Sequence, residues 1–179
     1  MATTVTTTAK ADYRLLEPII LKWEGGFVND PNDAGGATNK GVTLNTYKAY
    51  RKKKKLPTPT VEDLKKISQT EWREIFKTMY WDIWRADEIN SQAIANIVVD
   101  WYWLSGKYGI TIPQRILKVF VDGKVGPKTL AATNGANQVK LHKDIYDARV
   151  KYIDDICKSR PANEKYRKGW MNRLAEFKP

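Results

Sequence analysis

Residues 23–43 read WEGGFVNDPNDAGGATNKGVT, and this stretch decides how the chain is organised. Upstream of it, apolar residues recur at helical spacing, so we predict a first helix over about residues 12–24, with Pro18 marking a kink or a late start. Gly25 and Gly26 follow, and glycine readily takes the left-handed conformation that ends a helix. Residues 25–43 contain six glycines or prolines, which predicts a glycine-rich loop or a short hairpin after the first helix.

Two carboxyl groups in this stretch lie in unlike surroundings. Glu24 falls in the last turn of the predicted helix, where the helix dipole disfavours negative charge. Trp23 and Phe27 can exclude water from it, and both effects favour the protonated acid. Asp33 lies in the polar loop, where backbone N–H groups can keep a carboxylate ionised. Cleavage of a glycosidic bond requires such a pair, so Glu24 is a candidate general acid and Asp33 a candidate second carboxylate.

Other polar residues of the loop are open to two interpretations. Asp30 is the alternative second carboxylate and a candidate substrate-binding residue, but either aspartate can instead form an Asx-turn. Thr38 can help to hold an attacking water in catalysis, and Thr43 can do so or bind substrate. Each threonine can equally be a turn or helix-cap residue.

The rest of the chain has helical periodicity, and we count six to eight helices and no convincing run of alternating strands. Threonine or serine caps begin three of them, at Thr43, Thr60 and Ser68. The later helices are predicted over about residues 91–104, 112–119, from Pro127 onward, 137–158 and 162–176. The fold class is therefore mainly α.

Composition restricts the classes of partner and cofactor. The chain has 179 residues, 42% of them hydrophobic, which suffices for one domain with a core or a main lobe with a satellite. Its net charge of +11 indicates an acidic partner, such as nucleic acid, anionic lipid or an anionic cell-wall polymer. Cys157 and His142 are single residues of their types, so we expect no disulfide, no metal and no cofactor.

The N-terminal region bears on where the protein is made. Residues 1–10 are threonine-rich and we predict them to be disordered, without the apolar segment of a secretory signal. No apolar stretch approaches the ~18 residues of a membrane span, so we expect no membrane insertion. We expect a protein made in the cytoplasm that reaches an extracellular target after release or by non-classical export. The oligomeric state does not follow from the sequence.

Two stretches carry a resemblance to a known family. Residues 23–30, with Asp33, Thr38 and the flanking glycines, resemble the N-terminal signature of the glycoside hydrolase family 108 lysozymes, the N-acetylmuramidases of bacteria and phages. Residues 121–130, VDGKVGPKTL, and the ending KGWMNR at 168–173 resemble that family's C-terminal region, a predicted peptidoglycan-binding segment. The family more often has tyrosine where this chain has Phe27.

The resemblance implies a lysozyme-like helical fold with the catalytic glutamate at the end of the first helix. It implies a catalytic region over residues 11–105 and a C-terminal peptidoglycan-binding-like region over 106–179, packed together as one compact unit. The related phage lysozymes space glutamate, aspartate and threonine much as Glu24, Asp33 and Thr38 are spaced, which favours Asp33 over Asp30. The implied activity is cleavage of the β-1,4 bond between N-acetylmuramic acid and N-acetylglucosamine, and the implied partner is bacterial peptidoglycan rather than nucleic acid.

Sugar binding generally uses aromatic rings and polar side chains. Tyr102 and Trp103 are candidates, with core packing as the alternative for each, whereas Trp101 fits the apolar face. Asn96 and Asp100 are four residues apart and can line a groove or a solvated face. Further aromatic candidates are Trp81 and Trp84.

Other functional classes explain less of the chain. A basic nucleic-acid-binding protein would account for the charge, but no helix-turn-helix, zinc-finger or ribonucleoprotein signature accompanies it. A non-catalytic cell-wall-binding protein would account for residues 121–130 and leave the Glu24 loop unexplained. A zinc amidase lacks histidines, and His142 and Cys157 lie too far apart on one predicted helix for a cysteine peptidase. A calcium loop from Asp30 would end at a glycine instead of a glutamate.

Overall fold

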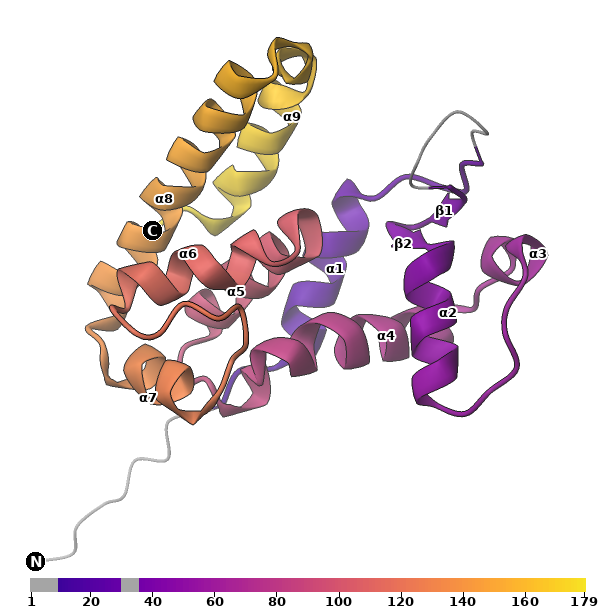
Figure 1. Ribbon diagram of the computed structural model, residues 1–179, viewed down its shortest axis with the longest axis horizontal. Coiled ribbons are helices and arrows are strands. Elements are labelled where there is room, and N and C mark those ends of the chain that lie inside the picture. Colours follow the sequence, from indigo (N-terminus) through magenta and orange to yellow (C-terminus); the bar gives the residue numbers. More distant parts are fainter. Residues whose placement is uncertain (1–9, 30–35) are drawn as a thin grey trace, which may run out of the picture. The chain divides into compact units, whose positions relative to one another are not determined.

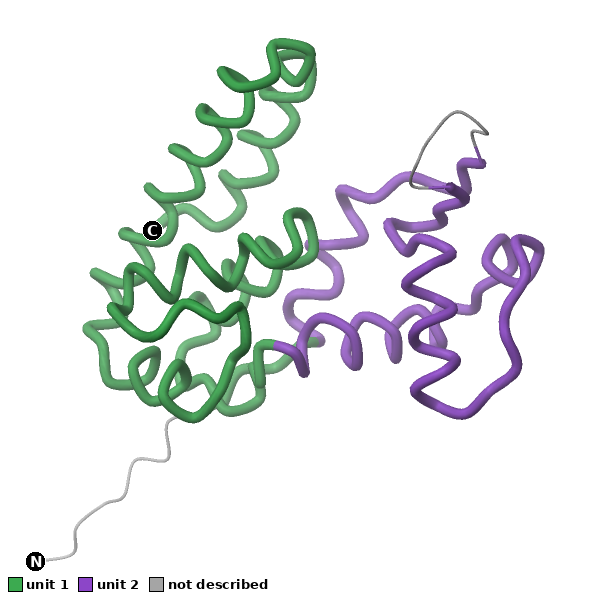
Figure 2. Tube along the Cα trace, viewed as in Figure 1, with its two compact units in different colours: residues 1–13, 84–179 green, residues 14–83 purple. Residues whose placement is uncertain are grey.

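The computed structural model describes residues 10–29 and 36–179, and this part of the chain is mainly α-helical with one two-stranded sheet (Figure 1). The mainly α fold class expected from the sequence is confirmed. Two compact units divide the chain, one of residues 14–83 and one of residues 84–179 together with the N-terminal segment up to Tyr13 (Figure 2). The sequence analysis expected a boundary between residues 105 and 106, and that division stays a prediction.

The described residues of the 14–83 unit form four α-helices and a hairpin. Its elements are α1 (Tyr13–Trp23), β1 (Thr38–Asn39), β2 (Val42–Thr43), α2 (Leu44–Lys53), α3 (Val61–Lys65) and α4 (Gln69–Phe76), followed by a π-helical turn at Lys77–Trp81. The expected caps are confirmed, because Thr43, Thr60 and Ser68 each accept a hydrogen bond from a backbone N–H of the first turn. At α3 the Asp63 carboxylate completes a capping box with Thr60.

Large aromatic side chains fill the core of this unit. Trp72 stacks on Phe76 with ring centroids 5.5 Å apart, and Tyr47 and Tyr50 of α2 are buried with them. Trp81 is fully buried at 0% exposure, and Trp84, just beyond the unit, at 1%. The expectation that Trp81 and Trp84 are sugar-binding candidates was therefore wrong, because neither ring presents a face to solvent.

The first helix differs from its prediction at both ends. It begins at Tyr13 and continues through Pro18, and it ends at Trp23, so Glu24 is the first residue beyond it. Neither Gly25 nor Gly26 takes a left-handed conformation, and the prediction that they end the helix in this way was wrong. Both glycines have open space where a Cβ would be.

The 84–179 unit is built on five helices. They are α5 (Gln92–Ser105), α6 (Tyr108–Ile116), α7 (Pro127–Gly135), α8 (Gln138–Ser159) and α9 (Glu164–Leu174). In Figure 1, α8 and α9 lie side by side and form a helical hairpin. Helix α6 begins four residues earlier than expected, because Gly109 lets it pack directly on α5, where a Cβ would lie 2.4 Å from the backbone nitrogen of Tyr102.

A buried ionic cluster joins three segments of this unit. Asp100 of α5, which is 0% exposed, accepts hydrogen bonds from Arg149 of α8 at 2.8 Å and from Arg173 of α9 at 2.7 Å. Arg149 also donates to the carbonyl oxygen of Ile97 at 3.1 Å. Charges this deeply buried need such partners, so the cluster specifies how α8 and α9 dock on α5.

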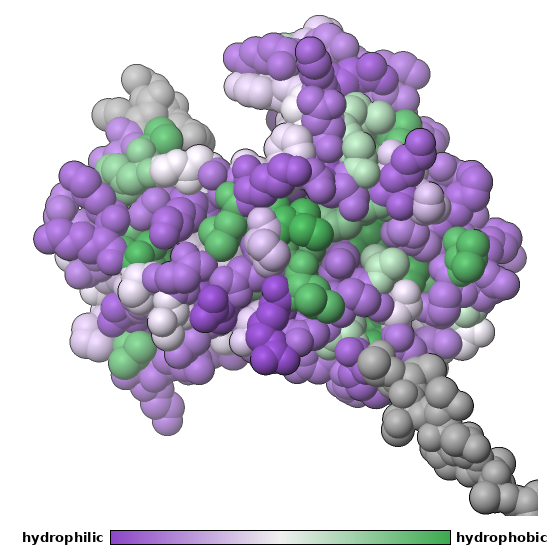
Figure 3. All heavy atoms as spheres, turned by 180° about the vertical axis from the view of Figure 1, so that it is seen from behind, coloured by the Kyte–Doolittle hydropathy of each residue, from purple (hydrophilic) through white to green (hydrophobic). Residues whose placement is uncertain are grey.

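The surface of the protein is polar. Hydrophilic side chains cover most of the face in Figure 3, as the net charge of +11 leads one to expect. Within residues 10–29 and 36–179, none of the helices combines the length and the apolar character needed to cross a bilayer.

Candidate active site

Glu24 lies directly after α1, between two half-buried aromatic residues. Its backbone N–H reaches the carbonyl oxygen of Leu21 at 3.4 Å, so the chain is still turning at this point. Glu24, Trp23 and Phe27 are each half-buried. The Nζ atom of Lys22 lies 5.5 Å from the centre of the Trp23 ring. Glu24 is thus attached at the negative end of the dipole of α1, in a segment that also carries Trp23 and Lys22.

An ion pair between the buried Glu17 and the partly exposed Arg73 holds α1, the helix that Glu24 directly follows. The Glu17 carboxylate accepts hydrogen bonds from Nε and Nη2 of Arg73 on α4, at 2.6 and 2.9 Å. Gln69 donates a third, at 3.0 Å. The hydrogen bond from Arg73 lowers the pKa of Glu17 below its ordinary value, against the opposing effect of burial. Because the geometry is bidentate, it fixes α1 against α4 in orientation as well as distance.

The hairpin after the loop places two of the candidate threonines opposite each other. Lys40 and Gly41 connect its strands with φ angles of 47° and 74°, the positive values of a type I′ turn. In this register Thr38 pairs with Thr43. Directly opposed residues of an antiparallel pair point to the same face, so both hydroxyl groups lie on one face of the hairpin.

A backbone bridge ties this hairpin to the segment that follows Glu24. Val28 and Thr38 exchange two backbone hydrogen bonds, each of 2.8 Å. Val28 is four positions after Glu24, which limits the Cα–Cα distance between them to about 14 Å. The structure therefore keeps Glu24, Thr38 and Thr43 in one small region of the 14–83 unit.

Two side chains hold the hairpin in place, and the sequence analysis missed their role. The indole Nε1 of Trp72 donates to the carbonyl oxygen of Lys40 at 2.9 Å, which attaches the turn to α4. The amide of Asn39 donates to the carbonyl oxygens of Leu64 and Lys65, at 2.9 and 3.1 Å, which attaches it to α3. Asn39 is buried, and a buried amide needs hydrogen-bond partners, but the sequence shows only an asparagine in a polar loop and does not reveal that burial.

The candidate residues of the loop have different outcomes. Thr43 is the N-cap of α2 and accepts a hydrogen bond from the N–H of Thr46 at 3.1 Å. The alternative prediction, that Thr43 is a helix-cap residue, is therefore confirmed. The Thr38 hydroxyl reaches the carbonyl oxygen of Gly36 at 3.5 Å. Asp30 and Asp33 lie outside the described residues, and their roles stay predictions.

The candidate substrate-binding residues in the 84–179 unit also have different outcomes. Asp100 cannot line a groove, because its carboxylate is fully buried between two arginines, so the prediction of a substrate contact there was wrong. The Asn96 side-chain oxygen accepts a hydrogen bond from Gln92 at 2.7 Å. Tyr102 and Trp103 are half-buried, and burial raises the pKa of the Tyr102 hydroxyl. A sugar-binding role for Asn96, Tyr102 and Trp103 stays a prediction.

The loop at residues 121–130 is held by hydrogen bonds from a buried glutamine. Gln114 of α6 is fully buried, and its amide donates to Asp122 and to the carbonyl oxygen of Lys124, both at 2.9 Å. Its oxygen accepts the N–H of Gly123 at 2.9 Å. The Asp122 carboxylate and the backbone groups of Gly123 and Lys124 therefore help to build the loop.

Metal ligation has no support in the described part of the chain. Over residues 10–29 and 36–179, no group of three or more histidine, cysteine, aspartate or glutamate side chains is arranged to hold an ion.

Comparisons with known proteins agree with the arrangement. Residues 18–106 match the model of the family glycosyl hydrolase 108, and residues 108–175 match that of the family "Predicted Peptidoglycan domain". The solved structure of SagA from Brucella abortus is similar, with a TM-score of 0.76 and 26% sequence identity over 92% of this chain and 90% of that one. No curated protein matches the sequence.

Proposed function

The chain belongs to the glycosyl hydrolase 108 family and is a peptidoglycan hydrolase, and we propose which bond it cleaves and with which acid. The proposed bond is the β-1,4 bond between N-acetylmuramic acid and N-acetylglucosamine, and the proposed general acid is Glu24. A glycoside hydrolase needs a protonated carboxyl group beside the glycosidic oxygen. Two observations support Glu24 in this role: residues 23–30 resemble the family's N-terminal signature, and Glu24 lies half-buried directly after α1.

The observation that supports this assignment is that the chain is anchored on both sides of Glu24. Helix α1 is held by the Glu17–Arg73 pair, and the chain after Glu24 is bridged to the hairpin at Thr38. Catalytic groups act efficiently when neighbouring structure holds them within a fraction of an ångström of a productive position. A glutamate that only ended a helix would not need two independent attachments.

In the proposed reaction, the Glu24 carboxyl group gives its proton to the leaving O4 oxygen of N-acetylglucosamine as the C1–O4 bond breaks. The positive charge that develops at C1 of N-acetylmuramic acid requires a second carboxylate, and the family's spacing favours Asp33 over Asp30 for this role. Thr38 is proposed to help hold the attacking water. The products are a new reducing end on muramic acid and a free O4 hydroxyl group on glucosamine.

The stereochemistry of the product distinguishes two versions of this mechanism. If the two carboxyl groups stand about 6.5–9.5 Å apart, a water attacks directly and the anomeric configuration inverts. If they stand about 5–5.5 Å apart, the second carboxylate attacks C1 and the configuration is retained. NMR of the freshly formed anomer separates the two.

The charge of the protein supports an acidic polymer as substrate. Peptidoglycan carries peptide carboxylates, and a net charge of +11 draws the enzyme to such a surface. We propose that the protein acts on the wall after release from the cytoplasm.

The decisive experiment compares Glu24→Gln with Glu62→Gln on purified wall sacculi. Glu62 is an exposed carboxylate in the same unit, so its variant controls for the loss of one charge. We expect new reducing ends from the wild type and from Glu62→Gln, and a loss of about 10²–10⁴-fold in Glu24→Gln. Unchanged turnover in folded Glu24→Gln would show that Glu24 is not the general acid. Binding to sacculi without any new reducing ends in the wild type would favour a binding protein.

A further inference from the structure

Residues 40–66 carry most of the chain's positive charge. They contain nine lysine and arginine residues against two acidic residues, so they contribute +7 to the net charge of +11. In Figure 1 this segment runs from the β1–β2 turn through α2 and a long loop to the end of α3. Seven of its lysines are exposed, and we call them the lysine surface: Lys48, Lys52, Lys53, Lys54, Lys55, Lys65 and Lys66.

The protein itself does not neutralise the lysine surface. Arg51, in the same segment, pairs with Glu71 at 2.9 Å, but none of the seven lysines forms an ion pair with a described residue. By contrast, Lys140, Lys143 and Lys151 of α8 each pair with an aspartate one turn later, at 2.5–2.6 Å. Neighbouring like charges repel one another, so the lysine surface is stabilised by an external partner that carries negative charge.

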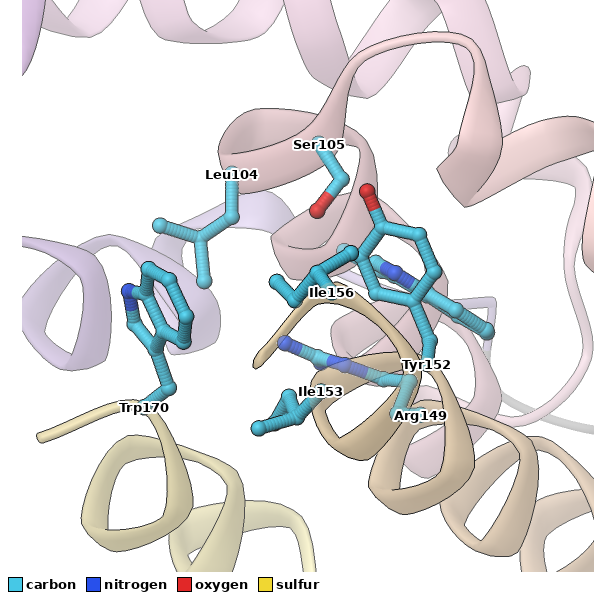
Figure 4. Close-up of a pocket in the computed structure, with 8 residues that line it drawn as sticks. Leu104, Ser105, Arg149, Tyr152, Ile153, Ile156 and Trp170 are labelled. Atoms are coloured by element: carbon cyan, nitrogen blue, oxygen red, sulfur yellow. The ribbon is translucent and has the colours of Figure 1, made fainter. Parts of the chain in front are cut away.

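The pocket drawn in Figure 4 does not offer an alternative site for an anion. It lies in the 84–179 unit, and Arg149 is the one charged side chain among its described lining residues. The guanidinium group of Arg149 already donates to the Asp100 carboxylate at 2.8 Å and to the carbonyl oxygen of Ile97 at 3.1 Å. Its charge is therefore satisfied inside the protein, whereas the lysine surface faces solvent.

Lys55 occupies a backbone position that favours glycine. Helix α2 ends in a Schellman motif, in which the N–H of Leu56 donates to the carbonyl oxygen of Arg51 at 2.9 Å. The N–H of Lys55 donates to the carbonyl oxygen of Lys52 at 3.1 Å, and Lys55 has a φ of 57°, which a residue with a Cβ adopts at a cost. The helix dipole explains cations in the last turn of α2, but it does not explain a strained lysine beyond that turn. A charge kept at such a position indicates a functional role.

The side chains around the lysines favour a bilayer over a soluble polyanion. Lysine is a flexible point charge without bidentate geometry, so seven of them suit a surface of many anionic groups. Surfaces that bind single-stranded nucleic acid present aromatic rings to the bases, but Tyr47 and Tyr50, the aromatic residues of α2, are buried. Leu56 directly follows the lysine run and is 45% exposed. An apolar side chain among cations gains free energy at a membrane interface, where hydrocarbon lies below anionic headgroups.

We propose that the lysine surface docks the protein on an anionic phospholipid bilayer, with Leu56 at the level of the headgroups. The docking is peripheral, because ammonium groups meet headgroup phosphates and one leucine side chain enters the interface. Each lysine close to such a membrane strengthens binding by about fivefold. The proposal goes beyond the proposed hydrolase activity and does not depend on it. It places the 14–83 unit, which carries Glu24, next to a membrane.

The test is sedimentation of the full chain with vesicles of phosphatidylcholine mixed with phosphatidylglycerol, and with vesicles of phosphatidylcholine alone. We expect binding to the anionic vesicles only. The double variant Lys52→Gln/Lys53→Gln is expected to bind them about 10- to 30-fold more weakly. Lys143→Gln/Lys151→Gln removes the same net charge from α8 and is expected to stay within about threefold of the wild type. Equal losses in the two double variants, or no binding to anionic vesicles, would overturn the proposal.

Two single variants separate docking from misfolding and a bilayer from a soluble polyanion. Lys55→Gly relieves the positive φ, so it is expected to raise the Tm and yet to weaken vesicle binding about fivefold. Leu56→Ser is expected to weaken vesicle binding about three- to tenfold and to leave binding of soluble polyphosphate unchanged. Unaltered vesicle affinity in either variant, or tighter binding of polyphosphate than of anionic vesicles, would refute bilayer docking. Purified sacculi contain no bilayer, so their digestion tests the proposed function separately.

Discussion

Glu17 and Arg73 form a bidentate ion pair, with Nε–Oε2 and Nη2–Oε1 distances of 2.6 and 2.9 Å, that joins α1 to α4. Glu17 lies on α1 seven residues before Glu24, which directly follows that helix, so Glu17 is buried about two turns before the proposed acid. The pair fixes the helix from which the catalytic segment emerges. Its effect on activity is therefore one of positioning.

The first prediction concerns this pair and pH. Arg73 lowers the folded-state pKa of Glu17 below its unfolded value, so the stabilisation is present above the unfolded pKa and is lost as pH falls through the folded one. Glu17→Gln is expected to cost about 1–2 kcal/mol at neutral pH, since Arg73 is partly exposed, and less at pH 3. Urea unfolding at both pH values measures this, with Glu62→Gln as the control. An equal loss at both pH values would contradict the linkage.

The second prediction concerns Trp72, which attaches the hairpin turn to α4. Trp72→Phe keeps an aromatic ring beside Phe76 but removes the donor to the carbonyl oxygen of Lys40. We expect a loss of about 1–3 kcal/mol in the free energy of unfolding and lower turnover, because the hairpin that carries Thr38 loosens. Thermal unfolding and reducing-end assays measure the two effects. Unaltered turnover in a folded, destabilised variant would show that the hairpin does not take part in catalysis.

The third prediction separates the two candidate second carboxylates. Asp33→Asn is expected to lower turnover strongly, whereas Asp30→Asn is expected to leave it within about threefold of the wild type, because only one carboxylate faces the developing positive charge. Initial rates on sacculi at equal enzyme concentration measure both. The opposite ranking would assign the role to Asp30.

The fourth prediction concerns the buried cluster around Asp100. Asp100→Asn leaves the guanidinium groups of Arg149 and Arg173 without their shared carboxylate, and it is expected to cost about 3–5 kcal/mol. Denaturant unfolding measures the loss. Asp87→Asn, at an exposed position of the same unit, is the control. A variant as stable as the wild type would mean that α8 and α9 dock without this cluster.

The fifth prediction concerns salt. Because the net charge is +11, binding to anionic wall is expected to weaken steeply as ionic strength rises, since the screening length falls from about 10 Å at 0.1 M to about 3 Å at 1 M. Sedimentation of Glu24→Gln with sacculi measures this without cleavage. Binding that is equally strong at both salt concentrations would exclude a major electrostatic contribution.

Local sequence signals were sufficient for most helices and their beginnings. Thr43, Thr60 and Ser68 cap helices as expected, because a cap involves only a side chain and a backbone N–H three residues away. The expected start of α6 was late by four residues, because its first turn is stabilised by close packing of Gly109 on α5. Such packing cannot be detected from the spacing of apolar residues along the chain.

The sequence by itself determined the helical fold class, the capped helices and the position of Glu24 beside a helix end, because each depends on residues close together in the chain. Only the tertiary structure decided that Asp100 is a buried partner of two arginines and that Trp72 and Asn39 clamp the hairpin. These contacts join residues 25 to 73 positions apart. Whether a polar side chain meets a ligand or a distant part of its own chain depends on how the helices pack, and periodicity along one helix does not specify that packing.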